Sequence, residues 1–479
     1  MVGLVNREKE STKLLEAWNR RGPALVLLYG RRRLGKTFFL QDFLKTHRGI
    51  YFLGADSTSR ENLGEFLGQL RRAFPERQDA TPANYPTWRS ALRLLCDLAN
   101  DEPLAVVLDE FGYLCHADSA IPSILQSVWD SDARRTMLRL ILCGSEVGVL
   151  SSLDEYGQPL HGRFDWRGYF QPLDYYDTAR FIAASSPGDT YPAKDMMLTY
   201  GLYGGGGRYL AAIDPTRSVS ENVAFQMLDP NGIFHNEGES LVRQERNIRD
   251  MAGYNAILAA IASGATQWGE VINQSHVERA TLPTYLSRLQ QLGLVVHEKP
   301  FEEPDRRGLY RLADNMLQSW YRYVFRWRSA IQMADPREAW NQLVQPDLPV
   351  YMGLEVFEGI CRQHLVRFSS RYSLPLIVDI GRWWSRNSQV EIDIVAHLKD
   401  DSYIFGECKW TASPVDVDEL IKLQRKVELL PHDSWKKEPR YILFSSGGFK
   451  PYLRERAREV NVVLVGPEEL FPEMRLSEQ

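Results

Sequence analysis

The sequence contains few cysteines, and this scarcity excludes two kinds of stabilisation. Only 5 occur in 479 residues. None has the paired spacing of a zinc site, and an odd number of scattered, mostly apolar-flanked thiols does not suit a disulfide framework. We therefore expect buried free thiols in a reducing compartment. The positions are Cys96, Cys115, Cys143, Cys361 and Cys408.

Long hydrophobic runs and an excess of positive charge are also absent. No apolar run approaches the roughly 18 residues that a membrane span needs, and the N-terminus has no secretory h-region. The net charge is −5 and the pI is near 6.1, so nucleic-acid binding would require a local basic patch. The sequence predicts a cytoplasmic α/β multidomain protein with no membrane partner.

The strongest motif present is a phosphate-binding P-loop. The pattern GxxxxGKT lies at residues 30–37, between an apolar run and a segment with helical spacing. Glycines let the backbone amides face a polyphosphate, the lysine reaches the outer phosphates, and the threonine hydroxyl can ligate magnesium. The alternative is an exposed glycine turn. The residues that we assign to the nucleotide here are Gly30, Leu34, Gly35, Lys36, Thr37 and Phe38.

Two further apolar strands end in polar residues that suit ATP hydrolysis. Residues 104–108 lead into Asp109 and Glu110, a Walker B pattern. Asp109 would hold magnesium through water, and Glu110 would polarise the attacking water. Residues 138–143 lead to Ser145, where a polar sensor would touch the γ-phosphate. The alternative is a buried parallel strand whose acids cap the next segment.

The pattern along the chain predicts three domains. Residues 1–240 alternate strands and helices, as a P-loop domain with a parallel sheet would. Residues 241–345 read as three helices and a hairpin, a winged helix-turn-helix. Its helices could enter a DNA groove. The alternative is that they serve only for packing, since the net charge of this segment is near zero. The exposed positions on the candidate recognition helix are Thr281, Thr284 and Arg288.

Aromatic and arginine residues alternate over residues 320–328. Such a segment could be a stacking platform for bases or an aromatic core helix with solvated arginines. The pattern favours the core helix.

Residues 346–479 contain a second candidate active site. Alternate residues of a strand share a face, so Glu391 and Asp393 point one way, as do Glu407 and Lys409 on the next strand. If an odd number of residues turns the chain between them, Asp393 lies opposite Glu407. Both carboxylates could then hold one divalent ion, while Lys409 activates the water that attacks a phosphodiester. The alternative is an amphipathic hairpin with a charged outer face. Glu358, on the preceding helix, is the candidate third magnesium ligand.

Together these motifs resemble the prokaryotic archaeal-type ATPases, a STAND/AAA+ family with a winged helix and a C-terminal PD-(D/E)XK nuclease-like domain. The segment Leu4–Glu10 is similar to the family's N-terminal box, which makes Asn6 and Arg7 base-side candidates. A PLxGR-like segment makes Arg163 a γ-phosphate sensor in cis. A GGxPxYL-like lid segment, in which Gly207 replaces the proline, places Arg208 as another sensor.

The resemblance implies ATP and magnesium as cofactors and DNA as the expected partner. Our first hypothesis is an ATP-hydrolysing protein that couples nucleotide state to DNA binding and magnesium-dependent DNA cleavage. The second is a nucleotide switch that governs homo-oligomer assembly or partner binding, with a non-catalytic nuclease-like domain. A small-molecule kinase would need only the P-loop and leaves the other two units unexplained.

Overall fold

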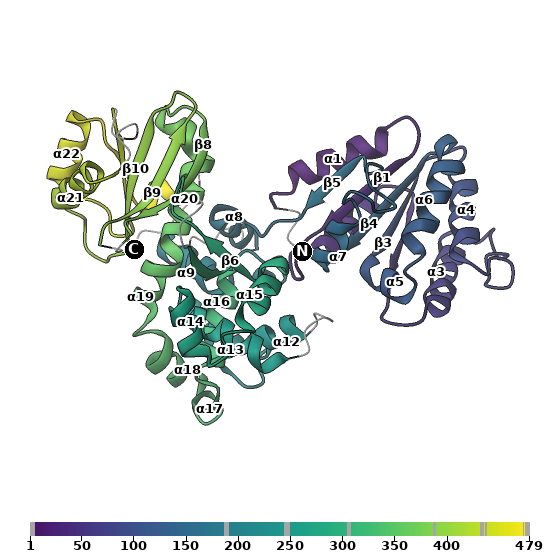
Figure 1. Cartoon of the computed structure of the whole chain (residues 1–479), viewed down its shortest axis with the longest axis horizontal. Coiled ribbons are helices and arrows are strands. Elements are labelled where there is room, and N and C mark those ends of the chain that lie inside the picture. The colour runs from purple at the N-terminus through teal and green to yellow at the C-terminus, as the bar shows by residue number, and fades with distance from the viewer. Residues whose placement is uncertain are drawn as a thin grey trace.

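The computed structural model describes residues 5–185, 191–243, 250–303, 308–386, 389–431, 435, 438–472 and 474. Figure 1 shows an α/β unit on one side, a helical unit in the middle and a second α/β unit on the other side. Each described helix is too short or too polar to cross a lipid bilayer.

The first unit is a five-stranded parallel sheet with the strand order β2-β3-β4-β1-β5. Its central strands are apolar except for Arg139 on β4 and Asp109 at the end of β3, as strands covered by helices on both faces are. In this order the strand that precedes the P-loop, β1, pairs with β4 and β5, and the Walker B strand β3 pairs with β4 and β2. The strands are β1 (Ala24–Tyr29), β2 (Gly49–Leu53), β3 (Leu104–Asp109), β4 (Leu138–Gly144) and β5 (Trp166–Tyr169).

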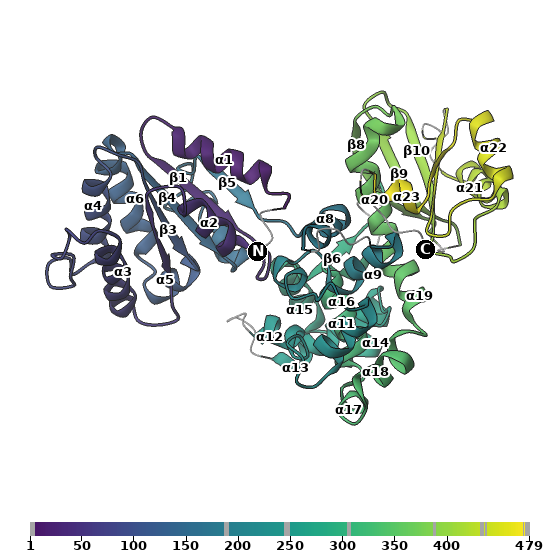
Figure 2. The ribbon, with the colours of Figure 1, turned by 180° about the vertical axis from the view of Figure 1, so that it is seen from behind.

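Helices form a layer on each face of this sheet. Helices α1 and α2 bury one face of the sheet, and the other helices bury the opposite face. Figure 2 shows both helices in the view from behind. The helices are α1 (Glu8–Asn19), α2 (Lys36–Leu44), α3 (Ser59–Ala73), α4 (Trp88–Leu98), α5 (Phe111–Ala117), α6 (Ile121–Ser131), η1 (Ala133–Arg135) and α7 (Val147–Ser152).

The described residues of the middle unit form helices and one antiparallel hairpin. The helices and hairpin predicted after residue 241 are present as α13 to α15 and β6–β7. The elements are α8 (Tyr175–Ser185), α9 (Ala193–Tyr203), α10 (Gly207–Leu210), α11 (Val219–Val223), η2 (Ala224–Leu228), α12 (Glu237–Arg243), α13 (Met251–Ala262), α14 (Trp268–Ser275), α15 (Leu282–Gln291), β6 (Val295–Glu298), β7 (Leu309–Leu312), α16 (Asn315–Ser319), η3 (Trp320–Phe325), α17 (Arg328–Ile331), α18 (Pro336–Ala339), η4 (Trp340–Val344), α19 (Leu348–Tyr351) and η5 (Met352–Val356).

One hydrophobic core runs through the whole middle unit. It includes Leu173 near the start of the unit, Met227 before the predicted boundary at residue 240, and Leu258 after it. The cores of the first unit end at Phe170. The boundary between cores therefore falls near residue 172, and the lid that we assigned to the P-loop domain packs with the following helices instead.

The third unit is a five-stranded sheet with the order β12-β11-β10-β9-β8, in which β8–β9 and β9–β10 are antiparallel and the other pairs parallel. Helix α20 packs on one face as part of the core of the middle unit, and α21 and α22 pack on the other. The elements are α20 (Phe357–Phe368), η6 (Ser369–Tyr372), β8 (Ile377–Trp384), β9 (Glu391–Leu398), β10 (Tyr403–Lys409), α21 (Val417–Glu428), β11 (Arg440–Ser445), α22 (Pro451–Glu459), β12 (Val463–Val465) and α23 (Pro467–Leu470).

The aromatic segment at 320–328 belongs to the core. Trp320, Tyr321 and Tyr323 are at most 3% exposed, so their faces are not available to stack on bases. Arg322, between them, is 13% exposed and donates to Asp347 at 2.9 Å, and Arg326, after them, is exposed. The core-helix interpretation is therefore confirmed.

The hairpin β6–β7 is held against the third unit by the segment that follows β6. The Phe301 N–H donates to the Arg382 carbonyl on β8 at 2.7 Å, and the Phe301 ring is buried in the core of the third unit. The Trp383 indole donates to Glu303 at 2.8 Å. This contact occupies part of the hairpin that a wing would present to DNA.

Candidate functional site

The P-loop connects β1 directly to α2, as predicted. Gly30 is needed because a β-carbon there would lie 2.5 Å from the Phe170 carbonyl oxygen. Gly35, immediately before α2, has φ +92°, which favours glycine. The loop amides thus reach the N-terminus of α2, the position at which backbone N–H groups bind phosphate.

Lys36 is folded back onto the loop. Its ammonium group donates to the carbonyls of Gly30 at 2.7 Å and Arg31 at 2.9 Å. Burial lowers the pKa of Lys36, while Glu110 and Asp109 raise it and Arg32 lowers it further. The cation therefore lies between the loop and the Walker B acids, and the outer phosphates of a nucleotide would replace the two carbonyl contacts.

Asp109 is buried and receives hydrogen bonds on both carboxylate oxygens. Thr37 and Tyr51 each donate to Oδ2 at 2.7 Å, and the Glu110 N–H donates to Oδ1 at 2.9 Å. Because Thr37 and Asp109 face each other, their oxygens fit a shared magnesium ion, which when bound would neutralise phosphate charge. Tyr51, on β2, was not predicted, since a tyrosine inside a strand gives no signal until the strand order is known.

Glu110 pairs with the predicted sensor serine. The Ser145 hydroxyl donates to the Glu110 carboxylate at 2.9 Å, and its N–H donates at 3.2 Å. Glu110 has φ +49°, an uncommon conformation for a residue with a side chain. The strand ends thus bring Glu110 and Ser145 together next to the P-loop, as the sequence predicted.

The predicted base-side residues lie beside the P-loop, although Leu4, the first residue of their box, falls outside the described residues. The Arg7 guanidinium lies 3.8 Å above the Phe170 ring and donates to the Gln171 carbonyl at 2.8 Å. Asn6 precedes it with φ +49°. Of the two loop-flanking candidates, Leu34 is buried and Phe38 is exposed.

The structure contradicts the prediction that Arg163 senses the γ-phosphate. Strand β5 runs parallel to β1, and the Asp165 N–H donates to the Leu25 carbonyl at 2.8 Å. Arg163 therefore lies at the end of the sheet opposite to the P-loop, where it donates to Asp130 on α6 at 2.7 Å. The PLxGR-like segment supplies a structural ion pair here.

The lid segment contacts the P-loop through its backbone. The Arg208 N–H donates to the Arg33 carbonyl at 3.1 Å, while the Arg208 side chain is exposed. Tyr209 is buried and its hydroxyl donates to Glu237 at 2.9 Å. The lid is thus in place beside the loop, with Arg208 on its outer surface.

Two P-loop arginines bind acids of the middle unit. Arg31 forms an ion pair with Asp314, and Arg33 donates to Glu237 at 2.8 Å. Both acids are buried. We call these two ion pairs the P-loop clamp; they join the nucleotide loop to α12 and to the turn before α16.

The charged residues of the third unit meet where β9 and β10 pair. Gly406 lies opposite Ile394, so the next pair in this register is Glu407 opposite Asp393, as predicted. The Cys408 N–H donates to Asp393 at 2.8 Å, and Lys409 donates to Glu407 at 2.8 Å. Lys426 on α21, which was not predicted, also donates to Glu407 at 2.8 Å. We call these four residues, Asp393, Glu407, Lys409 and Lys426, the acid–lysine cluster.

The acid–lysine cluster fits a metal only in part. Asp393 and Glu407 supply two neighbouring carboxylates, whereas Glu358, the predicted third ligand, forms an ion pair with Arg382 at 3.0 Å. Glu391 is half exposed at the strand end and lies 3.7 Å from Arg382. In the described part of the chain, no three Asp, Glu, His or Cys side chains gather as a metal site.

Replacing Asp393 with asparagine should make folding stability less sensitive to pH. Burial, with the charges of Glu358 and Glu407, raises the pKa of Asp393 from 3.8 to about 7. The folded state therefore holds this proton where the unfolded state has released it, so wild-type stability falls as pH rises from about 4 to 7. The Asp393→Asn variant should gain nothing at pH 4 and roughly 4 kcal/mol at pH 8. Urea unfolding in EDTA at both pH values measures the difference; an equal effect at both would contradict it.

Comparisons with known proteins match two parts of the chain. A family described as an ATPase domain predominantly from Archaea matches residues 4–213, and a family of archaeal and bacterial proteins of unknown function matches residues 320–421. An uncharacterized protein of Methanocaldococcus jannaschii is 25% identical over 441 residues, 90% of this chain and 94% of that protein. A second one from that organism is 39% identical over 114 residues, 22% of this chain and 98% of that protein.

Among solved structures, a Walker-type ATPase of Pyrococcus abyssi is similar with a TM-score of 0.49 and 22% identity, covering 67% of this chain and 96% of that one. The matched ATPase domain contains the P-loop, Asp109, Glu110 and Ser145 described above. The chain therefore belongs to the archaeal-type ATPase family.

Proposed function

We propose that this ATPase uses ATP at the P-loop to control DNA binding and magnesium-dependent DNA cleavage at the acid–lysine cluster. The observation that carries the cleavage part is the register of β9 and β10, which sets Asp393 opposite Glu407, with Lys409 2.8 Å from Glu407. Two carboxylates and a lysine on adjacent strands are the groups that metal-assisted phosphodiester hydrolysis needs.

Each of these residues has a part in the proposed cleavage. Asp393 and Glu407 would hold a magnesium ion, which supplies Lewis acidity to the scissile phosphate. Lys409 lies at the open edge of the site and would orient the attacking water. Lys426 holds Glu407 from the other side through both carboxylate oxygens, at 2.8 and 3.0 Å, and so fixes its orientation.

The coupling part of the proposal rests on the P-loop clamp and on the docked hairpin. Nucleotide phosphates at the loop would change the charge around Arg31 and Arg33. These two arginines bind the middle unit through their ion pairs with Asp314 and Glu237. The middle unit in turn contacts the third unit through Phe301 and Arg382. We interpret α13 to α15 with β6–β7 as a winged helix that transmits this change, and the third unit as a nuclease-like fold.

A supercoiled-plasmid assay tests cleavage. With magnesium and ATP the wild type should nick the plasmid, and Asp393→Ala should lower the rate by at least 100-fold. Asp401→Ala is the matched control, because Asp401 lies in the turn of the same hairpin and is 94% exposed. Equal nicking by wild type and Asp393→Ala, or none by either, would reject the cleavage part.

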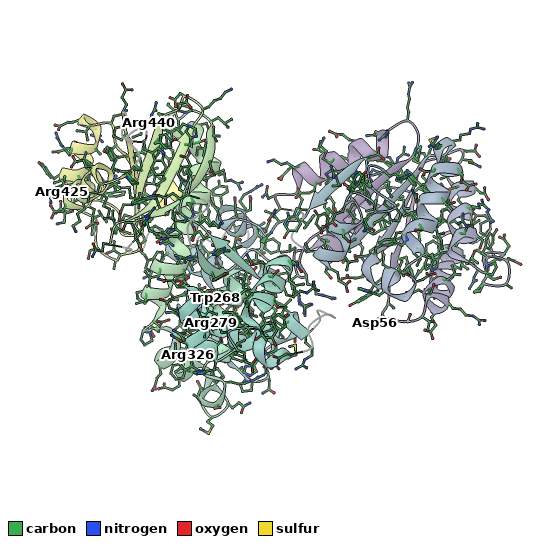
Figure 3. All side chains as sticks on the ribbon, in the orientation of Figure 1. Asp56, Trp268, Arg279, Arg326, Arg425 and Arg440 are labelled. Carbon is green, nitrogen blue, oxygen red and sulfur yellow. The ribbon has the colours of Figure 1, made fainter. Side chains whose placement is uncertain are left out.

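A second function, a nucleotide switch without cleavage, is favoured by the state of Glu407. Two lysines already neutralise this carboxylate. Figure 3 shows Arg279 and Arg326 on the middle unit and Arg425 and Arg440 on the third. Gel-shift and sizing experiments with ATP against ADP separate the two functions. A pure switch would change its homo-oligomeric state or DNA affinity with nucleotide and leave the plasmid intact.

A further inference from the structure

We propose that Arg32, within the P-loop, contacts the terminal phosphate of ATP and distinguishes ATP from ADP. This inference rests on the ATP-hydrolysing part of the proposed function and is independent of DNA cleavage. It assigns to Arg32 the part that Arg163 cannot have from the opposite end of the sheet.

Two contacts place Arg32 where the terminal phosphate would lie. Its guanidinium is 3.9 Å from the Glu110 carboxylate and donates to the Tyr113 hydroxyl at 2.9 Å. Lys36 lies in the same loop, where its ammonium donates to the carbonyl of Arg31, the residue before Arg32, at 2.9 Å. Since Lys36 reaches the outer phosphates and Glu110 orients the attacking water, a cation that borders both residues borders the phosphate between them.

The three consecutive arginines of the loop divide into two groups. Arg31 and Arg33 bind the buried acids Asp314 and Glu237, as described for the P-loop clamp. Arg32 instead faces a carboxylate of the nucleotide site itself. Arg31 and Arg32 both line a cavity of about 30 Å³, together with Leu34, Ser145, Tyr209 and Asp314 among others.

The chemistry of the terminal phosphate explains why an arginine suits this position. In hydrolysis a water oxygen bonds to the terminal phosphorus while the bond to the bridging oxygen breaks. ADP leaves with that electron pair, one proton of the water stays on inorganic phosphate, and the other passes to solvent. Negative charge on the equatorial oxygens is stabilised by the planar guanidinium, which can bond two of them at once. ADP has no such group, so the contact would be made with ATP alone.

Binding measurements test the inference without relying on turnover. We would titrate ADP and the non-hydrolysable β,γ-imido analogue of ATP, each with magnesium, into wild type and Arg32→Ala by calorimetry. The variant should bind the analogue at least 10-fold more weakly and ADP within about 2-fold of wild type, and its kcat should fall about 100-fold. Unchanged ADP affinity also reports that the loop is folded. Arg32→Lys keeps the positive charge but loses the planar guanidinium. Its affinity for the ATP analogue should therefore lie between those of wild type and Arg32→Ala.

Further variants complete the experiment. Arg135→Ala, at an exposed position at the far end of the sheet, is the control and should match wild type. Equal loss of both nucleotides in Arg32→Ala, no loss, or a selective loss in Arg163→Ala would overturn the inference. If wild type binds neither nucleotide, the ATPase function fails as well, so the two failures are distinguishable.

Discussion

Lys36→Ala should abolish nucleotide binding and lower ATP hydrolysis by at least 1,000-fold, about 4 kcal/mol of transition-state stabilisation. The lysine is the buried cation that donates to the P-loop carbonyls, and it is the residue of the motif that contacts the outer phosphates. Fluorescent-nucleotide titration and phosphate-release assays measure both effects.

The matched control is Lys45→Ala, since Lys45 follows the end of the same helix and its side chain is 61% exposed. Residual hydrolysis within tenfold of wild type would contradict the assignment of the P-loop. Lys36→Ala also tests coupling between the two sites. If ATP controls DNA handling, any ATP-dependent nicking or gel shift should disappear in this variant although the acid–lysine cluster is intact.

Asp314→Asn should destabilise the protein by about 3 kcal/mol, because it leaves the Arg31 guanidinium, which is only 13% exposed, without its buried countercharge. The substitution is chosen to preserve a second role of Asp314, whose Oδ1 accepts the Met316 N–H at 2.9 Å at the start of α16. An amide oxygen can accept the same bond, so the variant isolates the ion pair. Urea unfolding of wild type and variant gives the difference.

A double-mutant cycle completes this test. Removing Arg31 as well should restore part of the loss, because the uncompensated charge is then gone. Glu16→Gln, which breaks an exposed ion pair on α1, should cost less than about 0.5 kcal/mol. A loss for Asp314→Asn as small as that for Glu16→Gln would mean that the P-loop clamp does not hold the units together.

Features that depend on short stretches of sequence could be predicted. The P-loop, Asp109 and Ser145 follow apolar strands, and parallel pairing brings the ends of such strands to one edge. The pairing of Asp393 with Glu407 followed from alternation and an odd turn, which the Leu398 N–H closes by donating to the Ser402 carbonyl at 2.9 Å.

Features that depend on distant packing could not be predicted. Tyr51 reaches Asp109 only because β2 lies beside β3, and Lys426 reaches Glu407 only because α21 packs over β10. The prediction for Arg163 was wrong for the same reason. A motif identifies a type of residue, but the direction of β5 determines which end of the sheet Arg163 occupies. The partners of Arg31 and Arg33 lie more than 200 positions away in the chain.

The break between cores near residue 172 has a practical consequence for fragment design. A fragment that ends there retains every strand of the first sheet and closed apolar layers on both faces. A fragment ending at residue 240 would carry Met227 and its neighbours without Leu258 and the helices that cover them. It would therefore expose a large apolar surface to solvent. Expression trials, crystallisation and domain exchange with related chains should therefore divide this protein just before α8.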